Sequence, residues 1–280
     1  MELNRTLNFW RFSTRMGAFA LAIASCLLFG CAPAEPGART EARAERVWSG
    51  HAFEVEGPGG ALESVVLAGV TAPEAELHPG AVEAARRALT GRLEAAGAAV
   101  TLRQGAEPER DRYDRRIVVA ETLDGDLAEI LVREGWLIVW PRPGERLDFG
   151  PLYSAERAAR AEAAGGWGAG VFVIAGPDPN ALALRLDGPV IVEGRVVDTG
   201  EARDGRVFVN FGLDWRSDFT ATADRSARTV FEEAGIDLMS LPGARVRVRG
   251  WLYDTNGPSI SLTHPAQLEI LDAPEPRRLR

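Results

Sequence analysis

The sequence predicts a mostly β fold with interleaved helices, arranged as two small barrels in series. Short apolar runs of strand length recur through most of the chain and are separated by turns that contain Pro or Gly. A few longer segments instead carry an apolar stripe at helical spacing. Short strands with helices packed on them are typical of small closed barrels, and 280 residues suffice for two of them.

The first block, residues 46–174, is expected to form a five-stranded barrel with three helices. Its expected strands are 46–48, 52–56, 64–70, 98–102, 116–120 and 136–140. Its expected helices are 79–95, 126–134 and 152–164. Pro79-Gly80 opens the first helix, Gly135 closes the second, and Gly165-Gly166 ends the third.

The second block, residues 188–272, is expected to form a smaller OB-like barrel. Its expected strands are 188–198, 206–212, 219–222, 244–252, 258–262 and 267–271. Asp224 is placed to cap a helix over 224–234. Three strands, a helix and further strands follow the order of an OB-fold. Residues 175–187 begin Ala-Gly-Pro-Asp-Pro and are expected to be a linker, and residues 273–280 a tail.

The N-terminus resembles a bacterial lipoprotein signal over residues 1–30. Arg5, Arg11 and Arg15 precede an uncharged, mostly apolar run over 16–30, which is too short to span a bilayer as a helix. The run ends Leu-Phe-Gly-Cys, so Cys31 is expected to be diacylated, which gives stable membrane anchoring. The alternatives are an ordinary signal peptide or a short membrane anchor.

This signal predicts an envelope lipoprotein. Ala32 follows the cysteine, which by the enterobacterial sorting rule indicates the outer membrane, facing the periplasm. Residues 31–45 are small and polar and are expected to be a flexible tether. Cys26 lies in the segment to be removed, so the processed chain has no thiol for a disulfide or a Cys-metal site.

Six ordered segments of the first block resemble the staphylococcal nuclease (thermonuclease) family. They are VWSGHAFEV, VVLAGVTAPE, a helix beginning PGA, DRYDRR, LVREGW and AERAARAEAAGGW, between residues 46 and 173. The resemblance implies an OB-type barrel and phosphodiester hydrolysis with one Ca²⁺, which takes oxygen ligands, while a Glu activates water and Arg groups stabilise the phosphate. The second block resembles the C-terminal module of proteobacterial thermonuclease-like proteins of undetermined role.

The family's catalytic positions are only partly preserved here. His51 and Thr71 stand where the two metal carboxylates are expected, and Val66 stands where the first phosphate-binding Arg is expected. Glu74 matches the general base and Arg115 the second Arg clamp. Arg112 and Tyr113 fill substrate-side positions beside Arg115, and Ala72 would supply a main-chain carbonyl. Glu74 and Arg115 are interpreted as either a residual phosphate site or a structural ion pair.

The resemblance therefore predicts no cofactor, with calcium only if the family activity were retained. A neutral imidazole is a poor Ca²⁺ ligand. A Zn²⁺ or Mn²⁺ site from His51 and Glu74 is conceivable, but two ligands are fewer than the three that a catalytic zinc normally takes.

Charge argues independently against nucleic acid as the main partner. The first block has 14 Arg against 20 acidic residues and the second has 9 against 13. Non-specific nucleic-acid binding depends on neutralising phosphates with cations. Arg245, Arg247 and Arg249 alternate along one expected strand and are the best anion-binding candidates, although they could equally form a solvated face paired with Glu193 or nearby acids. The block's aromatic residues are mainly expected in its core.

Three functions follow from these observations. The favoured one is a non-catalytic envelope module that binds a protein, a cell-wall component or a partner lipoprotein. The second is a weak or metal-altered periplasmic nuclease that uses Glu74 as base and Arg115 as phosphate clamp. The third is oligonucleotide or small-anion binding without hydrolysis through Arg245, Arg247 and Arg249.

Overall fold

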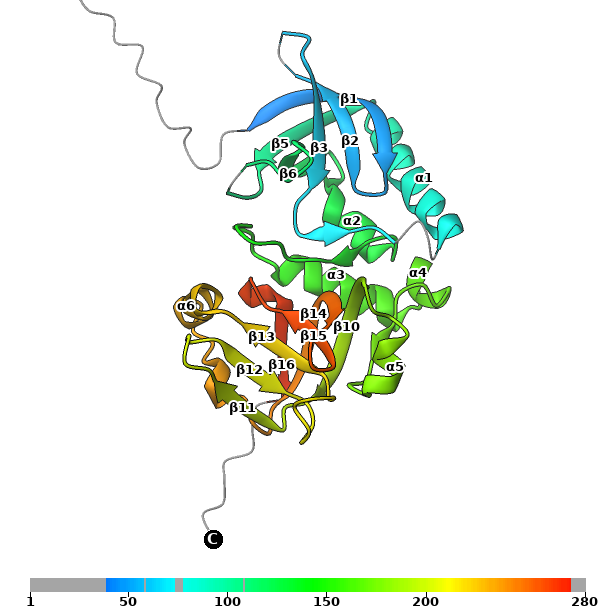
Figure 1. Ribbon diagram of the computed structural model, residues 1–280. Helices are drawn as coiled ribbons and strands as arrows, with labels where there is room; N and C mark the ends of the chain where they lie inside the picture. Colours follow the sequence, from blue (N-terminus) through cyan, green and yellow to red (C-terminus); the bar gives the residue numbers. More distant parts are fainter. Residues whose placement is uncertain (1–38, 58, 74–77, 108, 273–280) are drawn as a thin grey trace, which may run out of the picture. The chain divides into compact units, whose positions relative to one another are not determined.

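A computed structural model describes residues 39–57, 59–73, 78–107 and 109–272. They form a mixed α+β protein that is mostly sheet, and they all fall within one compact unit (Figure 1). No helix in these residues is long and apolar enough to cross a membrane. The signal, Cys31 and the tail after Asp272 lie outside the described residues.

The first part of the chain forms a closed five-stranded, OB-like barrel, as expected. Its strands are β1 (Thr40–Ser49), β2 (Ala52–Glu56), β3 (Leu62–Leu67), β5 (Ala99–Gln104) and β6 (Arg116–Thr122). Neighbours pair antiparallel in the order β3-β2-β1-β5-β6, and a parallel pairing of β3 with β6 closes the barrel. Alternation along β2 places Phe53 and Val55 in the core, as period-two patterning requires.

The three helices expected in this part are confirmed, the first with the expected ends and the other two with shifted ends. They are α1 (Pro79–Ala95), α2 (Leu127–Arg133) and α3 (Gly150–Ala161), followed by the short α4 (Gly165–Gly168). The Asp126 side chain caps α2 by accepting from the backbone N–H groups of Ala128 and Glu129. α2 packs against α1, α3 and β6, so the helices form a layer against the outside of the barrel (Figure 1).

Two expected segments differ from the prediction in this part. The strand expected over 64–70 is broken, because Gly69 adopts a left-handed φ of +73° that ends β3 before β4 (Val70–Thr71). β4 pairs with β8 (Ile138–Val139), and β7 (Gly125–Asp126) adds to β6. Residues 40–45, expected in the tether, instead belong to β1. There Ala42 and Ala44 pack against the core, although alanine has low β propensity.

The second part of the chain forms a larger sheet with its own apolar core. Its strands are β9 (Ile174–Ala175), β10 (Gly188–Arg195), β11 (Asp198–Glu201), β12 (Val207–Asn210), β13 (Thr220–Ala223), β14 (Arg245–Asp254), β15 (Pro258–Ser261) and β16 (Leu268–Asp272). The order is β11-β12-β13-β15-β14-β10-β9, with β16 on β14. The β13–β15 pairing is parallel, and α6 (Arg225–Glu233) stands between β13 and β14 in sequence. Two short helical turns, η1 (Leu238–Ser240) and η2 (Pro265–Gln267), complete it.

The segment expected as a linker is also ordered structure. β9 pairs in parallel with β10, and α5 (Pro179–Ala183) begins after the capping residue Asp178. Leu182 on α5 is fully buried in the core of the second sheet. One buried leucine in a Pro- and Asn-containing segment therefore ties residues 175–187 to the second sheet.

Candidate functional site

The turn between β1 and β2 places His51 where the nuclease resemblance expects a metal carboxylate. Ser49 Oγ lies 3.3 Å from Nδ1 of His51, and the His51 backbone carbonyl accepts from the N–H of Leu67 at 2.8 Å. Burial, together with the guanidinium groups of Arg142 and Arg115, lowers the pKa of His51 to about 3. His51 is therefore a neutral imidazole at physiological pH.

A fixed positive charge lies close to this histidine. Arg142, in the loop after β8, donates from Nη1 to the carbonyl of Leu67 at 3.2 Å and from Nη2 to that of Val70 at 2.7 Å. Buried Glu145 accepts from Nη1 of Arg142 at 3.2 Å and from the N–H of Gly69 at 2.9 Å. The guanidinium thus links the end of β3 to the start of β4, and its hydrogen bonds occupy the two carbonyl oxygens there.

Val66 and Thr71 lie in different environments. Val66 is fully buried in an apolar cluster with Ala52, Ala68 and Ile117, so the position of the expected phosphate-binding Arg belongs to the core. Thr71 is half-buried on β4 and pairs with Ile138 on β8. It offers a hydroxyl where a carboxylate is expected.

Arg115 has a carboxylate partner within its own turn. Its Nε and Nη2 donate to Oδ2 of Asp111 at 2.9 and 2.7 Å. The Asp111 Oδ1 also accepts from the backbone N–H groups of Tyr113 and Arg115, and these bonds hold the pKa of Asp111 below its ordinary value despite partial burial. Arg112 and Arg115 lie 4.8 and 5.1 Å from the centre of the exposed Tyr113 ring.

The described residues do not fit a calcium ion. Glu74, the expected general base, lies outside them, and no group of three His, Cys, Asp or Glu side chains among them could hold a metal. His51 contributes a neutral nitrogen, Thr71 a hydroxyl, and Arg142 a neighbouring positive charge. Ca²⁺ requires several oxygen ligands, chiefly carboxylates, which these side chains do not supply.

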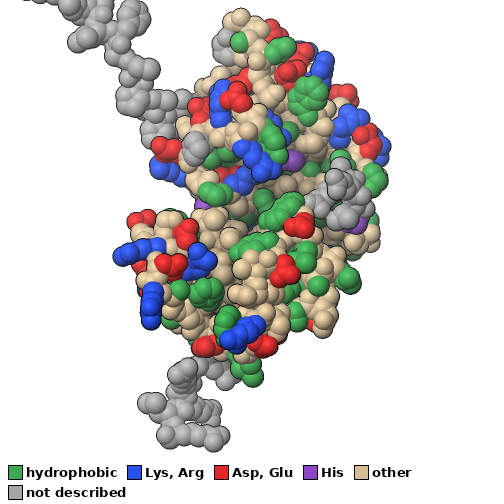
Figure 2. Space-filling model, viewed as in Figure 1, with side chains coloured by type: hydrophobic (Ala, Val, Ile, Leu, Met, Phe, Trp, Pro, Cys, Tyr) green, Lys and Arg blue, Asp and Glu red, His purple; other side chains and the backbone are tan. Residues whose placement is uncertain are grey.

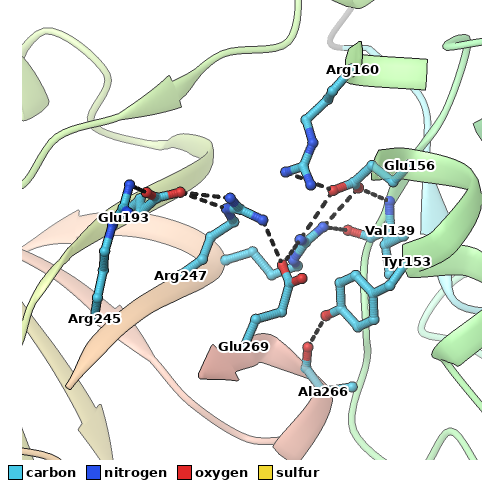
Figure 3. A network of polar contacts seen from close by, with 10 residues as sticks. Val139, Tyr153, Glu156, Arg160, Glu193, Arg245, Arg247, Ala266 and Glu269 are labelled. Carbon is cyan, nitrogen blue, oxygen red and sulfur yellow. Dashed lines mark hydrogen bonds and ion pairs between the residues drawn. The ribbon is translucent and has the colours of Figure 1, made fainter. Parts of the chain in front are cut away.

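The arginine stripe of β14 is paired with carboxylates (Figure 3). Arg245 pairs with Glu193, and Arg247 contacts Glu193 at 2.6 Å and Glu269 at 3.4 Å. Both therefore pair with Glu193, as the alternative interpretation expects, but only Arg245 is on a solvated face, because Arg247 is largely buried. Arg249 differs, because it is completely buried. The anion-binding role of the stripe stays a prediction, and each of its guanidinium groups already has an acidic partner.

Arg249 is the centre of a buried network, and its partners Glu156, Glu269 and Val139 are labelled in Figure 3. It donates to both carboxylate oxygens of Glu156 at 2.9 and 3.2 Å, to Glu269 at 2.6 Å and to the carbonyl of Val139 at 2.8 Å. Its guanidinium lies 4.7 Å from the centre of the Tyr153 ring. Burial opposes the charge of Glu156, but Arg249 and a backbone N–H outweigh it and lower the Glu156 pKa. This network joins α3 and β8 to β14 and β16.

Sequence reasoning did not find three residues of these sites, Arg142, Glu145 and Glu156. Arg142 and Glu145 lie in a Pro-Arg-Pro-Gly-Glu loop, where charged residues are ordinarily solvated. Glu156 could have been identified from the sequence, because it shares the buried face of α3 with Leu152, Ala155 and Ala159. An acidic residue in a helical apolar stripe predicts a buried cationic partner.

The structure divides the aromatic residues of the second part into two groups. Phe211 and Phe219 are buried in the core, but Phe208, Trp215, Trp251 and Tyr253 are not, so the expectation that these aromatic residues mainly pack in the core is wrong. Phe208, Trp215 and Tyr253 instead line a pocket of ≈ 400 Å³ over β12, β13 and β14. Trp251 is exposed elsewhere on β14.

The sequence matches no protein-family model and no curated protein.

Proposed function

We propose that this protein is a non-catalytic binding module of the bacterial envelope, built on a thermonuclease-like barrel that has lost its metal site. The closed barrel with a helix between its third and fourth strands is compatible with that resemblance. For the second part we propose an OB-like barrel, since β10 and β11 together act as its first strand and β13 and β15 pair in parallel.

The observation that carries the proposal is the Arg142 guanidinium beside His51. It lies against the carbonyls of Leu67 and Val70 and lowers the pKa of the neighbouring imidazole. A bound divalent cation there would meet the ion pair of Arg142 with Glu145, whose carboxylate already accepts from Arg142 and from the N–H of Gly69, and few other oxygen ligands. Without the cation, the family reaction lacks the group that polarises the phosphate.

The charge distribution supports the same conclusion. The chain has a formal net charge of −8, and Figure 2 shows acidic and basic side chains interspersed on the face drawn. A nucleic-acid substrate would instead be attracted by a field of positive charge. Attachment through Cys31 to the outer membrane, with a protein or cell-wall partner on the periplasmic side, completes the proposal.

The test is a phosphodiesterase assay on the full chain in detergent. Single- and double-stranded DNA are supplied with Ca²⁺, Mn²⁺ and Zn²⁺ in turn, and we expect no turnover above that of a no-enzyme control. Turnover that Arg115→Ala or Glu74→Gln abolishes, while Arg157→Ala preserves it, would contradict the proposal. Arg157 is a matched control because its Nη2 contacts Ser154 on an exposed part of α3, away from the barrel turn.

A gain-of-function variant tests the reason for the loss. The triple change His51→Asp, Val66→Arg and Thr71→Asp restores the expected ligands and clamp but leaves Arg142 in place. We expect no activity, because Val66→Arg also buries a charge in an apolar cluster. A second variant that combines His51→Asp, Thr71→Asp and Arg142→Gln tests whether the Arg142 guanidinium prevents a divalent cation from binding. Activity of the triple variant would show that only ligands are missing.

A further inference from the structure

A pocket opens on the outward face of the second sheet. Along β12, Val207 and Val209 point into the core, so Phe208 and Asn210 face outward, which is the period-two rule of a strand. The register sets Phe208 opposite Thr222 on β13, and the neighbouring loops enclose a pocket of ≈ 400 Å³. Pockets of this size with aromatic walls and a few polar groups are typical of small-ligand sites.

Three aromatic side chains, Phe208, Trp215 and Tyr253, form the apolar part of the pocket. Trp215 is 52% exposed, and the guanidinium of Arg216 lies 4.1 Å from its ring centre. A single exposed indole is ordinary, but Trp215 lines the pocket together with Phe208 and Tyr253, and grouped aromatic side chains of this kind mark binding sites.

The loop that carries Trp215 is held in place from two sides. The backbone N–H of Asp214 donates to Asp218 at 2.8 Å, and Ser217 Oγ donates to Asp214 at 3.1 Å. The turn after β14 packs directly against this loop, because Gly257 has a φ of +91° and a Cβ there would lie 2.5 Å from the carbonyl oxygen of Ser217. The wall is therefore formed before a ligand arrives, which lowers the entropy cost of binding.

Apart from Glu201 and Arg206, the polar side chains that line the pocket are neutral. The Tyr253 hydroxyl lies 3.3 Å from Thr222 Oγ1 and 3.0 Å from Ser261 Oγ. Asn210 accepts from Thr220 through Oδ1 at 3.2 Å. Hydroxyl and amide groups of this kind both donate and accept, so they can bind the hydroxyls of a ligand.

The two charged residues that line the pocket have ionic contacts. Glu201 contacts Arg228 at 2.8 Å, and Arg206 lies 3.8 Å from Asp204. Arg216, whose guanidinium lies over the Trp215 ring, is a further cation beside the pocket, so a polyanion with stacked bases is the competing ligand that the experiment must exclude.

We propose that this pocket binds a neutral β-linked oligosaccharide. A pyranose ring with equatorial hydroxyls has apolar C–H faces that stack on aromatic rings and an edge of hydroxyls that bond neutral polar groups, which is the combination present here. The inference rests on the proposed binding function and names its ligand class.

The experiment is calorimetric titration of the full chain in detergent with chitohexaose and, separately, cellohexaose. We expect a dissociation constant of about 1 mM or tighter for at least one of them. Trp215→Ala should weaken binding by at least about tenfold, because it removes a stacking surface. The matched control is Trp251→Ala, since Trp251 is also 52% exposed and on the same sheet but does not line the pocket.

Several results would overturn this inference. They are the absence of binding by both hexasaccharides, an equal loss in the two tryptophan variants, or preferential Trp215-dependent binding of oligo(dT). These outcomes differ from the result that would contradict the proposed function. That result is turnover of DNA that depends on Arg115. A chain that binds neither hexasaccharide and cleaves no DNA refutes only the ligand class.

Discussion

Arg249→Met tests whether the buried network of Figure 3 holds the two parts of the chain together. The substitution introduces an unbranched apolar side chain in place of the arginine. It removes a charge with 0% exposure and its bonds to Glu156, Glu269 and the Val139 carbonyl. Glu156, also 0% exposed, keeps the Val139 N–H at 2.8 Å and the more distant Arg160 at 3.6 Å. We expect a loss of about 3–5 kcal/mol in unfolding free energy, the usual cost of orphaning one member of a buried pair.

The measurement is urea unfolding followed by circular dichroism and tryptophan fluorescence. Arg245→Met is the matched control, since Arg245 is on the same strand and pairs with Glu193 but its side chain is 52% exposed. An exposed pair of this kind contributes at most about 1 kcal/mol. The double variant Glu156→Leu with Arg249→Met should recover much of the loss, because it leaves no buried charge at the Glu156 position.

The pH dependence gives a second readout of the same pair. The folded protein holds the Glu156 pKa below its ordinary value. Glu156 therefore stabilises the folded state at pH values above the ordinary pKa of a glutamate, and this stabilisation is lost as pH falls through the folded-state pKa. Without Arg249, burial raises the Glu156 pKa, so the variant should instead lose stability as pH rises. If Arg249→Met costs no more than Arg245→Met and leaves the pH profile unchanged, the reasoning about the network is wrong.

Two further predictions concern His51 and Gly135. With a folded pKa of about 3, His51 must stay neutral while the unfolded chain takes up a proton, so its contribution to stability is lost as pH falls from about 6.5. His51→Gln should therefore move the acid-denaturation midpoint to lower pH, and a midpoint equal to that of the unsubstituted protein would contradict this. Gly135 has a φ of +75°, and a Cβ there would lie 2.2 Å from the Ala164 carbonyl oxygen. Gly135→Ala should lower the thermal unfolding midpoint by an amount equivalent to more than about 1 kcal/mol, whereas Gly91→Ala, in an open position on α1, should raise it; a harmless Gly135→Ala would refute the steric argument.

Much of the fold was predictable from local patterns. Pro79 at a helix start and an Ala/Leu stripe predicted α1 with the ends that the structure shows. The alternation in β2 and the cap at Asp126 likewise depend only on residues that are close together in the sequence. The missed elements have a common cause, because residues 40–45 and Leu182 become ordered only through contacts with distant strands and cores. Their own composition resembles that of tethers and linkers.

The candidate sites were less predictable, since charged residues acquire meaning from their partners. The sequence placed Arg115 at a clamp position, but the partner that the structure gives it is Asp111. The sequence also predicted a solvated or anion-binding stripe at Arg245, Arg247 and Arg249. The structure instead buries Arg249 against Glu156, which is far away along the chain.

The sequence by itself determined the alternation of strands and helices, the acidic balance and the presence of His51 and Thr71 at the positions where the resemblance expects carboxylates. These properties depend on residue type and on spacing along the chain. Only the tertiary structure decided that Arg142 lies beside His51, and that Phe208, Trp215 and Tyr253 share a pocket while Phe211 and Phe219 do not. Such groupings arise from sheet register and barrel closure, which join residues far apart in sequence and give no local signal.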